Sequence, residues 1–214
     1  MKKNIRILIA DDHKIVVEGL RSLLEEEYDL VGMAENGREL LKLVKKLGPD
    51  VIVVDISMPL LNGIDAVAQL RESGCEAKVI FLTMHNDPAY AARAFDAGAS
   101  GFVLKHSAPS ELLTAIEKAL EGGQFISPMI TESLMEHYKT GGHGQGDPMK
   151  KLTPRQREVL QLLAEGKSAK EIAKLLSISA RTAEFHKYHI MEEMGLSNSA
   201  EIIHFAIKQG IISI

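Results

Sequence analysis

Short apolar runs alternate with stretches of helical periodicity over residues 5–120. The apolar runs are Ile5–Ala10, Leu30–Ala34, Val51–Val54, Val79–Leu82 and Gly101–Leu104. After the first run, Ile15, Leu20 and Leu24 are among the apolar residues that share one helical face. Strands that are apolar almost throughout, and that are separated by helices, indicate a parallel sheet with helices on both faces. The pattern predicts an α/β domain with a five-stranded, parallel, doubly wound sheet over residues 1–123.

The chain changes character after Gly122–Gly123. Residues 124–150 predict a linker, because a possible short helix at 127–138 is followed by a glycine-rich segment with little to bury. From residue 151 onward the pattern is helical, and a very short break at Ser177–Ser179 joins the two middle helices. Three capping boxes mark helix starts: Thr153 with Gln156, Ser168 with Glu171, and Asn198 with Glu201. We therefore expect a small all-α domain with helix-turn-helix spacing over residues 151–214.

Composition indicates a cytoplasmic protein with no membrane partner. No apolar run approaches the roughly 20 residues that cross a bilayer, and the basic start of the chain meets Asp11 and Asp12 too early for a signal peptide. The single cysteine, Cys75, can form no internal disulfide, which fits a reducing compartment. The net charge of -4 combines an acidic excess in residues 1–150 with a slight basic excess in residues 151–214. Such a split suggests two tasks, but the basic excess alone does not establish nucleic-acid binding.

Polar side chains follow four of the five predicted strands. Asp11 and Asp12 end the first strand, Asp55 ends the third, and Thr83 and Lys105 end the fourth and fifth. In an open parallel sheet these positions converge on one edge, where ligands bind. Clustered carboxylates repel unless a cation lies among them, and an all-oxygen site with few protein ligands suits Mg²⁺. A metal ion, a nucleophilic carboxylate and an ammonium group together indicate phosphoryl transfer.

Any one of these residues, taken alone, is more often a simple turn or cap residue. The five together, each at the end of a predicted strand, favour a site. Aspartyl-phosphate hydrolases also place an aspartate nucleophile after a buried strand, with an acid/base aspartate two residues further on. Ser57 occupies that place here, so we do not expect a dedicated phosphatase or any other enzyme.

Residues 1–123 resemble the receiver domain of bacterial two-component response regulators. The stretches that carry the resemblance are "ILIADDH", "PDVIVVDISMP", "NGIDAVAQLR", "VIFLTMH" and "AGASGFVLK". The resemblance implies a flavodoxin-like sheet of strand order 2-1-3-4-5, in which Asp55 accepts a phosphoryl group from a sensor histidine kinase.

The resemblance also implies a role for each polar residue of the site. Asp12, Asp55 and the main-chain carbonyl of Ser57 would bind Mg²⁺, with Asp11 assisting through water. Lys105 would pair with the phosphoryl group. Thr83 and Phe102 would form the switch pair, and Ser57 and His85 occupy positions that tune how long the phosphoryl group survives.

The predicted helix from Ser179 to Gly195 has two distinct faces. Ala183, Ile190 and Met194 form an apolar stripe that we expect to face the domain core. The opposite stripe carries two outward-pointing aromatic side chains, Phe185 and Tyr188. Such a pair can pack on another part of the chain, but on the second helix of a helix-turn-helix it lies where DNA bases are read. The expected DNA-binding residues are Arg181, Thr182, Glu184, Phe185, Lys187 and Tyr188.

Residues 151–212 resemble the LuxR-type helix-turn-helix of the NarL/FixJ response-regulator family. The matching text is "LTPRQREVLQLLAEGKSAKEIAKLLSIS" followed by "RTAEFHKYHIMEEMGL". The resemblance implies that Asn198–Gly210 is a dimerising helix, with Ile203, Ala206 and Ile207 as its apolar face. Glu184 departs from the family, which often has lysine there, and a glutamate can accept a hydrogen bond from cytosine.

Together these features predict a response regulator in which phosphorylation of Asp55 controls sequence-specific DNA binding and transcription. Phosphorylation would separate the domains or change their dimerisation, free the recognition helix and favour homodimers on inverted-repeat DNA. The alternative keeps the receiver but gives the C-terminal domain a protein partner instead of DNA. A constitutive, unphosphorylated regulator is a third possibility, against which the intact acidic set argues.

Overall fold

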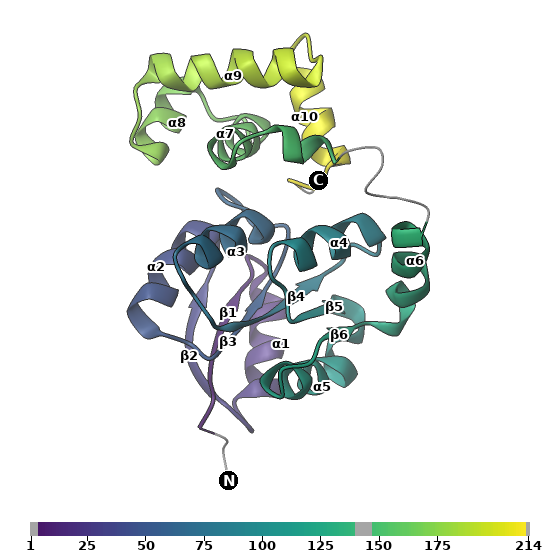
Figure 1. Ribbon diagram of the computed structural model, residues 1–214. Helices are drawn as coiled ribbons and strands as arrows, with labels where there is room; N and C mark the ends of the chain where they lie inside the picture. The colour runs from purple at the N-terminus through teal and green to yellow at the C-terminus, as the bar shows by residue number, and fades with distance from the viewer. Residues whose placement is uncertain (1–3, 140–146, 213–214) are drawn as a thin grey trace.

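The computed structural model describes residues 4–139 and 147–212. A parallel sheet of strand order β2-β1-β3-β4-β5-β6 forms the centre of the N-terminal domain (Figure 1). The strands are β1 Arg6–Ala10, β2 Asp29–Ala34, β3 Val51–Val54, β4 Lys78–Thr83, β5 Gly101–Leu104 and β6 Phe125–Ile126. The parallel α/β prediction and the order of the first five strands are therefore confirmed.

Helices cover both faces of the sheet because the buried strands alternate their apolar side chains between two cores. In β3, Val51 and Val53 face one core, whereas Ile52 and Val54 face the other. Helices α1 Lys14–Leu24 and α5 Ala108–Leu120, with η1 Lys105–Ser107 leading into α5, pack on the first face. The second face is covered by α2 Gly37–Leu47, α3 Gly63–Glu72, α4 Pro88–Asp96 and α6 Pro128–Lys139.

The sheet has a sixth strand that the sequence analysis did not predict. Phe125 and Ile126 pair in parallel with Gly101 and Phe102 of β5. After β6, the chain enters α6, whose Ile130 side chain is fully buried in the core. Two residues are too few to show a strand period, which explains why the pattern gave no sign of β6. Residues 140–146, the centre of the predicted flexible linker, lie outside the described residues.

The C-terminal domain consists of η2 Pro148–Lys151 and helices α7 Pro154–Ala164, α8 Ala169–Leu176, α9 Ala180–Met194 and α10 Ser199–Lys208 around a third core. The capping boxes at Thr153 and Ser168 are both formed. The third differs from the prediction. Asn198 accepts from the N–H of Glu201, but the Glu201 carboxylate accepts from the N–H of Ser197 rather than that of Asn198. The helix still starts at the expected place because the side chain of Asn198 caps it.

The two domains dock through α7 and the loop between β3 and α3 (Figure 1). Gln161 of α7 is fully buried; its Oε1 accepts from the Asn62 N–H at 2.8 Å, and its Nε2 donates to the Met58 carbonyl at 2.8 Å. Leu60 adopts a left-handed backbone conformation, with φ of 66°, and packs against the core of the helical domain. Its N–H donates to Glu165 at 2.8 Å. The helical domain therefore contacts the loop that directly follows Asp55.

Ion pairs surround this contact. Arg157 of α7 donates to Asp65 of α3 at 2.5 Å, and Arg38 of α2 donates to Glu158 of α7 at 2.6 Å. The carboxylates of Asp65 and Glu158 are nearly buried, so each ion pair is largely shielded from solvent. Within residues 4–139 and 147–212, no helix is long and apolar enough to span a lipid bilayer.

Candidate functional site

The carboxyl ends of β1, β3 and β5 bring the predicted acidic residues together. The Asp55 N–H donates to the Ala10 carbonyl at 2.8 Å, so strand pairing continues to the base of the Asp55 side chain. Gly63 approaches Asp55 so closely that a Cβ atom on Gly63 would lie 2.0 Å from the Asp55 carbonyl oxygen. Backbone pairing on one side and the start of α3 on the other therefore fix the position of Asp55.

The site is a compact cluster of charges. One ligand atom each from Asp11, Asp12, His13 and Asp55 lies within 4.8 Å of the others. Lys105 Nζ lies 2.7 Å from Asp11 Oδ2 and 2.7 Å from Asp55 Oδ2. Asp11 and Asp55 are buried, whereas Asp12 is exposed to solvent at the mouth of the site. A ligand entering from solvent would therefore meet Asp12 first and Asp55 behind it.

Burial and charge act in opposite directions on the two central groups. Burial raises the pKa of Asp55, and the neighbouring charge of Lys105 offsets this only in part. Burial alone would lower the pKa of Lys105, but the charge of Asp55 and hydrogen bonds to Asp11 and Asp55 outweigh it, so the pKa of Lys105 is raised. Lys105 is thus a firmly protonated cation beside carboxylates that need positive charge.

The donor set fits Mg²⁺. Asp11, Asp12 and Asp55 offer carboxylate oxygens within a few ångströms of one another, and hard divalent ions bind such oxygens together with water. The exposure of Asp12 leaves room for the waters that Mg²⁺ retains. Lys105 balances part of the negative charge of these carboxylates. A bound cation would take over that role, and the Lys105 ammonium group could then pair with an anionic ligand. His13, whose Nδ1 lies 3.1 Å from Asp11 and 2.9 Å from Asp12, is a further neighbour of this centre.

His85 connects the remaining predicted residues of the site. A hydrogen bond of 2.8 Å joins Ser57 Oγ and His85 Nε2, and the His85 N–H donates to Thr83 Oγ1 at 3.1 Å. Burial lowers the pKa of His85, which favours the neutral imidazole. Thr83 is fully buried, and Phe102 of β5 is equally buried, within the core that α4 covers.

The predicted DNA-binding residues lie on α9. Ala183 and Ile190 are buried as predicted, whereas Phe185 and Tyr188 are 64% and 65% exposed. The Thr182 N–H donates to Ser179 Oγ at 3.0 Å, so Thr182 belongs to the N-terminal cap of α9. Arg181 and Glu184 are also exposed, and Lys187 is partly exposed. An α-helix with this exposed face can enter a DNA major groove.

Two expectations about the helical domain are wrong. The recognition helix was expected to need freeing, but α9 lies on the side of the helical domain away from the sheet, and both aromatic side chains are already exposed (Figure 1). Ala206 was expected on the apolar face of the dimerising helix α10, but it is fully buried in the core of the helical domain. Ile202 and Ala206 form the core-facing stripe, one helical turn apart, and Ile203 remains 38% exposed.

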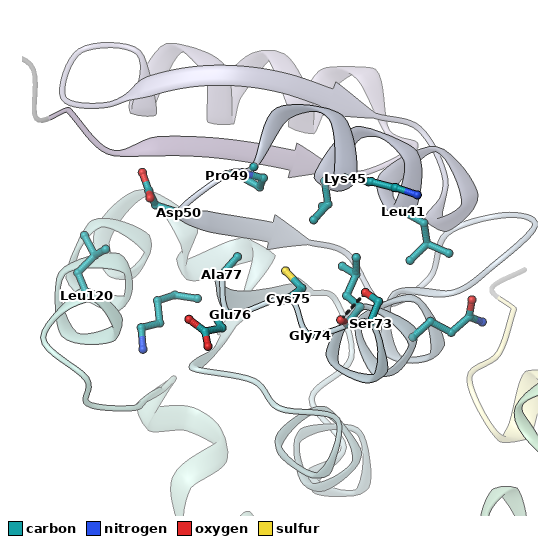
Figure 2. Close-up of a pocket in the computed structure, with 15 residues that line it drawn as sticks. Leu41, Lys45, Pro49, Asp50, Ser73, Gly74, Cys75, Glu76, Ala77 and Leu120 are labelled. Atoms are coloured by element: carbon teal, nitrogen blue, oxygen red, sulfur yellow. Dashed lines mark hydrogen bonds between the residues drawn. The ribbon is translucent and has the colours of Figure 1, made fainter.

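A second concave surface lies at the opposite end of the sheet. Figure 2 shows Leu41, Lys45, Cys75 and Ala77 around this groove, which adjoins the amino ends of β3 and β4. Ligands of open parallel sheets bind at the carboxyl ends of the strands, where the acidic cluster is found. The acidic cluster is therefore the stronger candidate for the functional site.

A receiver-type sheet with an acidic cluster, joined to a helix-turn-helix, defines a response regulator with a DNA-binding output domain. Residues 7–117 match the family model described as "Response regulator receiver domain", and residues 150–206 match "Bacterial regulatory proteins, luxR family". The chain belongs to the two-component response regulators that carry a LuxR-type helix-turn-helix, the NarL/FixJ type.

Full-length relatives support the same assignment. The chain is 35% identical over 215 residues to the transcriptional regulatory protein MctR of Rhizobium johnstonii, with 99% of this chain and 97% of the relative covered. It is 34% identical to the oxygen regulatory protein NreC of Staphylococcus carnosus, with 97% and 99% covered. Among solved structures, it resembles RcsB of Salmonella enterica bound to a promoter with the phosphomimetic BeF₃⁻, at a TM-score of 0.63 and 33% identity, with 95% and 98% covered.

Sequence reasoning missed two features of this arrangement. It assigned no role to His13, although its place directly after Asp11 and Asp12 signalled that it lies near the site. It also missed the docking residues Gln161 and Asn62, for which a single sequence offers no signal. A glutamine on a short helix has the same appearance whether it faces water or a neighbouring domain.

Proposed function

We propose that phosphorylation of Asp55 by a sensor histidine kinase controls DNA binding and transcription by this chain. The observation that carries the proposal is the cluster itself: a buried carboxylate on a rigid strand end, a protonated Lys105 at 2.7 Å, and two further carboxylates nearby. Such a set is suited to accepting a phosphoryl group and neutralising its charge. The proposed kinase and chromosomal DNA partners would place the protein in the bacterial cytoplasm.

In the proposed reaction, an Asp55 oxygen attacks the phosphorus of a phosphohistidine on the kinase. The new phosphorus–oxygen bond forms as the phosphorus–nitrogen bond breaks, and the leaving imidazole takes up a proton. Lys105 turns from the carboxylates to the phosphoryl oxygens, and the Thr83 hydroxyl donates to one of them. Thr83 and Phe102 are the proposed switch pair.

Mg²⁺ would be held by Asp11, Asp12, Asp55 and the Ser57 main-chain carbonyl. When bound, it would neutralise negative charge on the phosphoryl oxygens. The chain's own contribution is positional: β1 and β3 present the carboxylates, and the approach of Gly63 to the Asp55 backbone holds the nucleophile in place.

The proposed output is sequence-specific binding of α9 to double-stranded DNA. Arg181, Thr182 and Lys187 would contact phosphates, whereas Glu184, Phe185 and Tyr188 would contact bases and sugars. The active form would be a homodimer on inverted-repeat DNA. Because α9 is already exposed, phosphorylation would act on how two helical domains are positioned, rather than on access to the recognition helix.

The phosphorylation site is tested with a small phosphoryl donor and Mg²⁺. Wild-type protein should gain one phosphoryl group, as read by the mass of the intact chain, and Asp55→Asn should gain none. Asp29→Asn, which changes an exposed carboxylate in β2, is the matched control and should behave as wild type. Equal labelling of Asp55→Asn and wild type would overturn the site assignment.

A protein partner for the helical domain is the second candidate function. The acidic side chains of α9, at Glu184, Glu192 and Glu193, would repel DNA phosphates and could instead pair with cationic groups of a protein. Selection of bound DNA from a random pool separates the two candidates. Enrichment of an inverted repeat, lost in Tyr188→Ala, supports DNA binding, whereas the absence of any enriched sequence would favour the protein partner.

A further inference from the structure

A stack of two rings leads from the acidic site toward the helical domain. The imidazole of His85 is hydrogen-bonded to Ser57 through Nε2 and stacks on the ring of Tyr90 in α4, while the His85 backbone N–H donates to Thr83. The ring centroids are 4.4 Å apart and the planes are 12° from parallel. Tyr90 is nearly buried, so its ring cannot shift without moving its neighbours.

The hydroxyl end of the Tyr90 ring contacts the backbone that directly follows α10 in the helical domain. A Cβ atom on Gly210 would lie 1.7 Å from the Tyr90 hydroxyl oxygen and 2.1 Å from two ring carbons. Gly210 also adopts a left-handed conformation, with φ of 60°. Arg93 lies 4.8 Å from the Tyr90 ring centroid and donates to the Gln209 carbonyl at 2.8 Å. The Tyr90 ring therefore occupies space that is open only because residue 210 is a glycine.

We propose that His85, Tyr90 and Gly210 form a mechanical link through which the phosphorylation site controls docking of the helical domain. The inference rests on the proposed phosphorylation of Asp55. When the Thr83 hydroxyl turns toward a phosphoryl group, the His85 backbone loses its acceptor and the stacked rings move together. A displaced Tyr90 ring meets the Gly210 backbone, and the contact with α10 is lost.

Phe102 and Tyr90 have different surroundings in this scheme. Phe102 is enclosed in the core of the receiver domain, with no exposed surface. Tyr90 lies against both the site, through His85, and the other domain, through Gly210. A close-packed contact of this kind has two arrangements rather than a continuous range, which is what a switch requires. The link therefore adds a second route from Thr83, separate from the Phe102 position.

Two backbone amides report docking directly. The N–H groups of Leu60 and Asn62 donate across the interface, to Glu165 and Gln161, each at 2.8 Å. Their hydrogen exchange, followed by NMR, should accelerate when the domains separate.

The first experiment compares Gly210→Ala with Gly195→Ala. Gly195 has a similar φ of 65° but open space around its Cβ position, so it reproduces the backbone strain without the clash. Gly210→Ala should speed exchange of both reporter amides at least about tenfold, and Gly195→Ala should not. The effect of Gly210→Ala should vanish in a Tyr90→Ala background; an equal effect in both backgrounds would overturn the contact's proposed role.

The second experiment tests the coupling with Mg²⁺ and beryllium fluoride, a non-covalent phosphoryl mimic. Binding of the mimic should speed hydrogen exchange of the reporter amides in wild type. In His85→Ala, which lacks the stacked ring, exchange should stay slow even when the variant is saturated with the mimic. By reciprocity, Gly210→Ala should bind the mimic at least about fivefold more tightly than wild type. Should wild type fail to bind the mimic, the proposed function fails. If wild type binds the mimic and the reporter amides of His85→Ala still exchange faster on binding, the proposed link is wrong while the proposed function stands.

Discussion

Replacing Gln161 with alanine should open the interface between the two domains without unfolding either. Gln161 accepts from the Asn62 N–H at 2.8 Å and from Asn62 Nδ2 at 3.2 Å, and donates to the Met58 carbonyl at 2.8 Å. Each net hydrogen bond contributes about 1 kcal/mol, so the three together contribute roughly 3 kcal/mol to docking. That corresponds to a fall of about 100-fold in the ratio of docked to undocked molecules.

The loss should appear as domain separation because water can satisfy Met58 and Asn62 once the domains part. The assay is hydrogen exchange at the Leu60 amide, whose acceptor is Glu165 rather than Gln161. Small-angle X-ray scattering should show a larger radius of gyration in parallel. Gln124→Ala makes the same change at an exposed position and is the control.

Unchanged exchange at Leu60 in Gln161→Ala would refute this reasoning, since the docked state could not then depend on the buried glutamine. A lower unfolding midpoint of the helical domain, with no change in Leu60 exchange, would show that Gln161 acts within its own domain instead.

Four further changes test other parts of the account. Lys105→Met leaves two buried carboxylates without a counter-charge, at a cost of about 3 kcal/mol; thermal unfolding should occur at lower temperature and Mg²⁺ should restore part of the loss. Gly63→Ala places a methyl group against the Asp55 backbone and should weaken Mg²⁺ binding measured by calorimetry. Tyr188→Ala should weaken binding to a selected DNA site about tenfold, with no change in unfolding midpoint because the side chain is 65% exposed. Ser168→Ala should lower the unfolding midpoint of the helical domain at neutral pH. Hydrogen bonds from Ser168 hold the pKa of Glu171 below its usual range. The stabilisation that this provides is lost as pH falls through the folded-state pKa of Glu171. The difference in unfolding midpoint between Ser168→Ala and wild type should therefore shrink in acid.

Much of the fold could be predicted because its signals are local. The apolar run Val51–Val54 predicts a buried parallel strand, and its end places Asp55 at the sheet edge. The capping boxes at Thr153 and Ser168 involve residues three apart, so the sequence contains both partners. Convergence of Asp11, Asp55 and Lys105 follows from parallel topology alone, since successive strand ends meet at the same edge.

The features that were not predicted depend on contacts between distant parts of the chain. The two-residue strand β6 exists because β5 offers a free edge, which the sequence of β6 does not reveal. Ala206 was placed on the dimerising face of α10 from the family resemblance alone, whereas it packs in the core of the helical domain, one turn from Ile202. Docking through Gln161 depends on the shape and hydrogen bonding of a surface contributed by the other domain.

The central claim is that phosphorylation of Asp55 changes DNA binding. The most direct measurement is a titration of the selected inverted-repeat DNA with wild-type protein and with Asp55→Asn, each with and without phosphoryl donor and Mg²⁺. Wild type should bind the DNA more tightly once donor is added, whereas Asp55→Asn should show no change. Equal affinity of wild type with and without donor, once its phosphorylation is verified by mass, would contradict the claim.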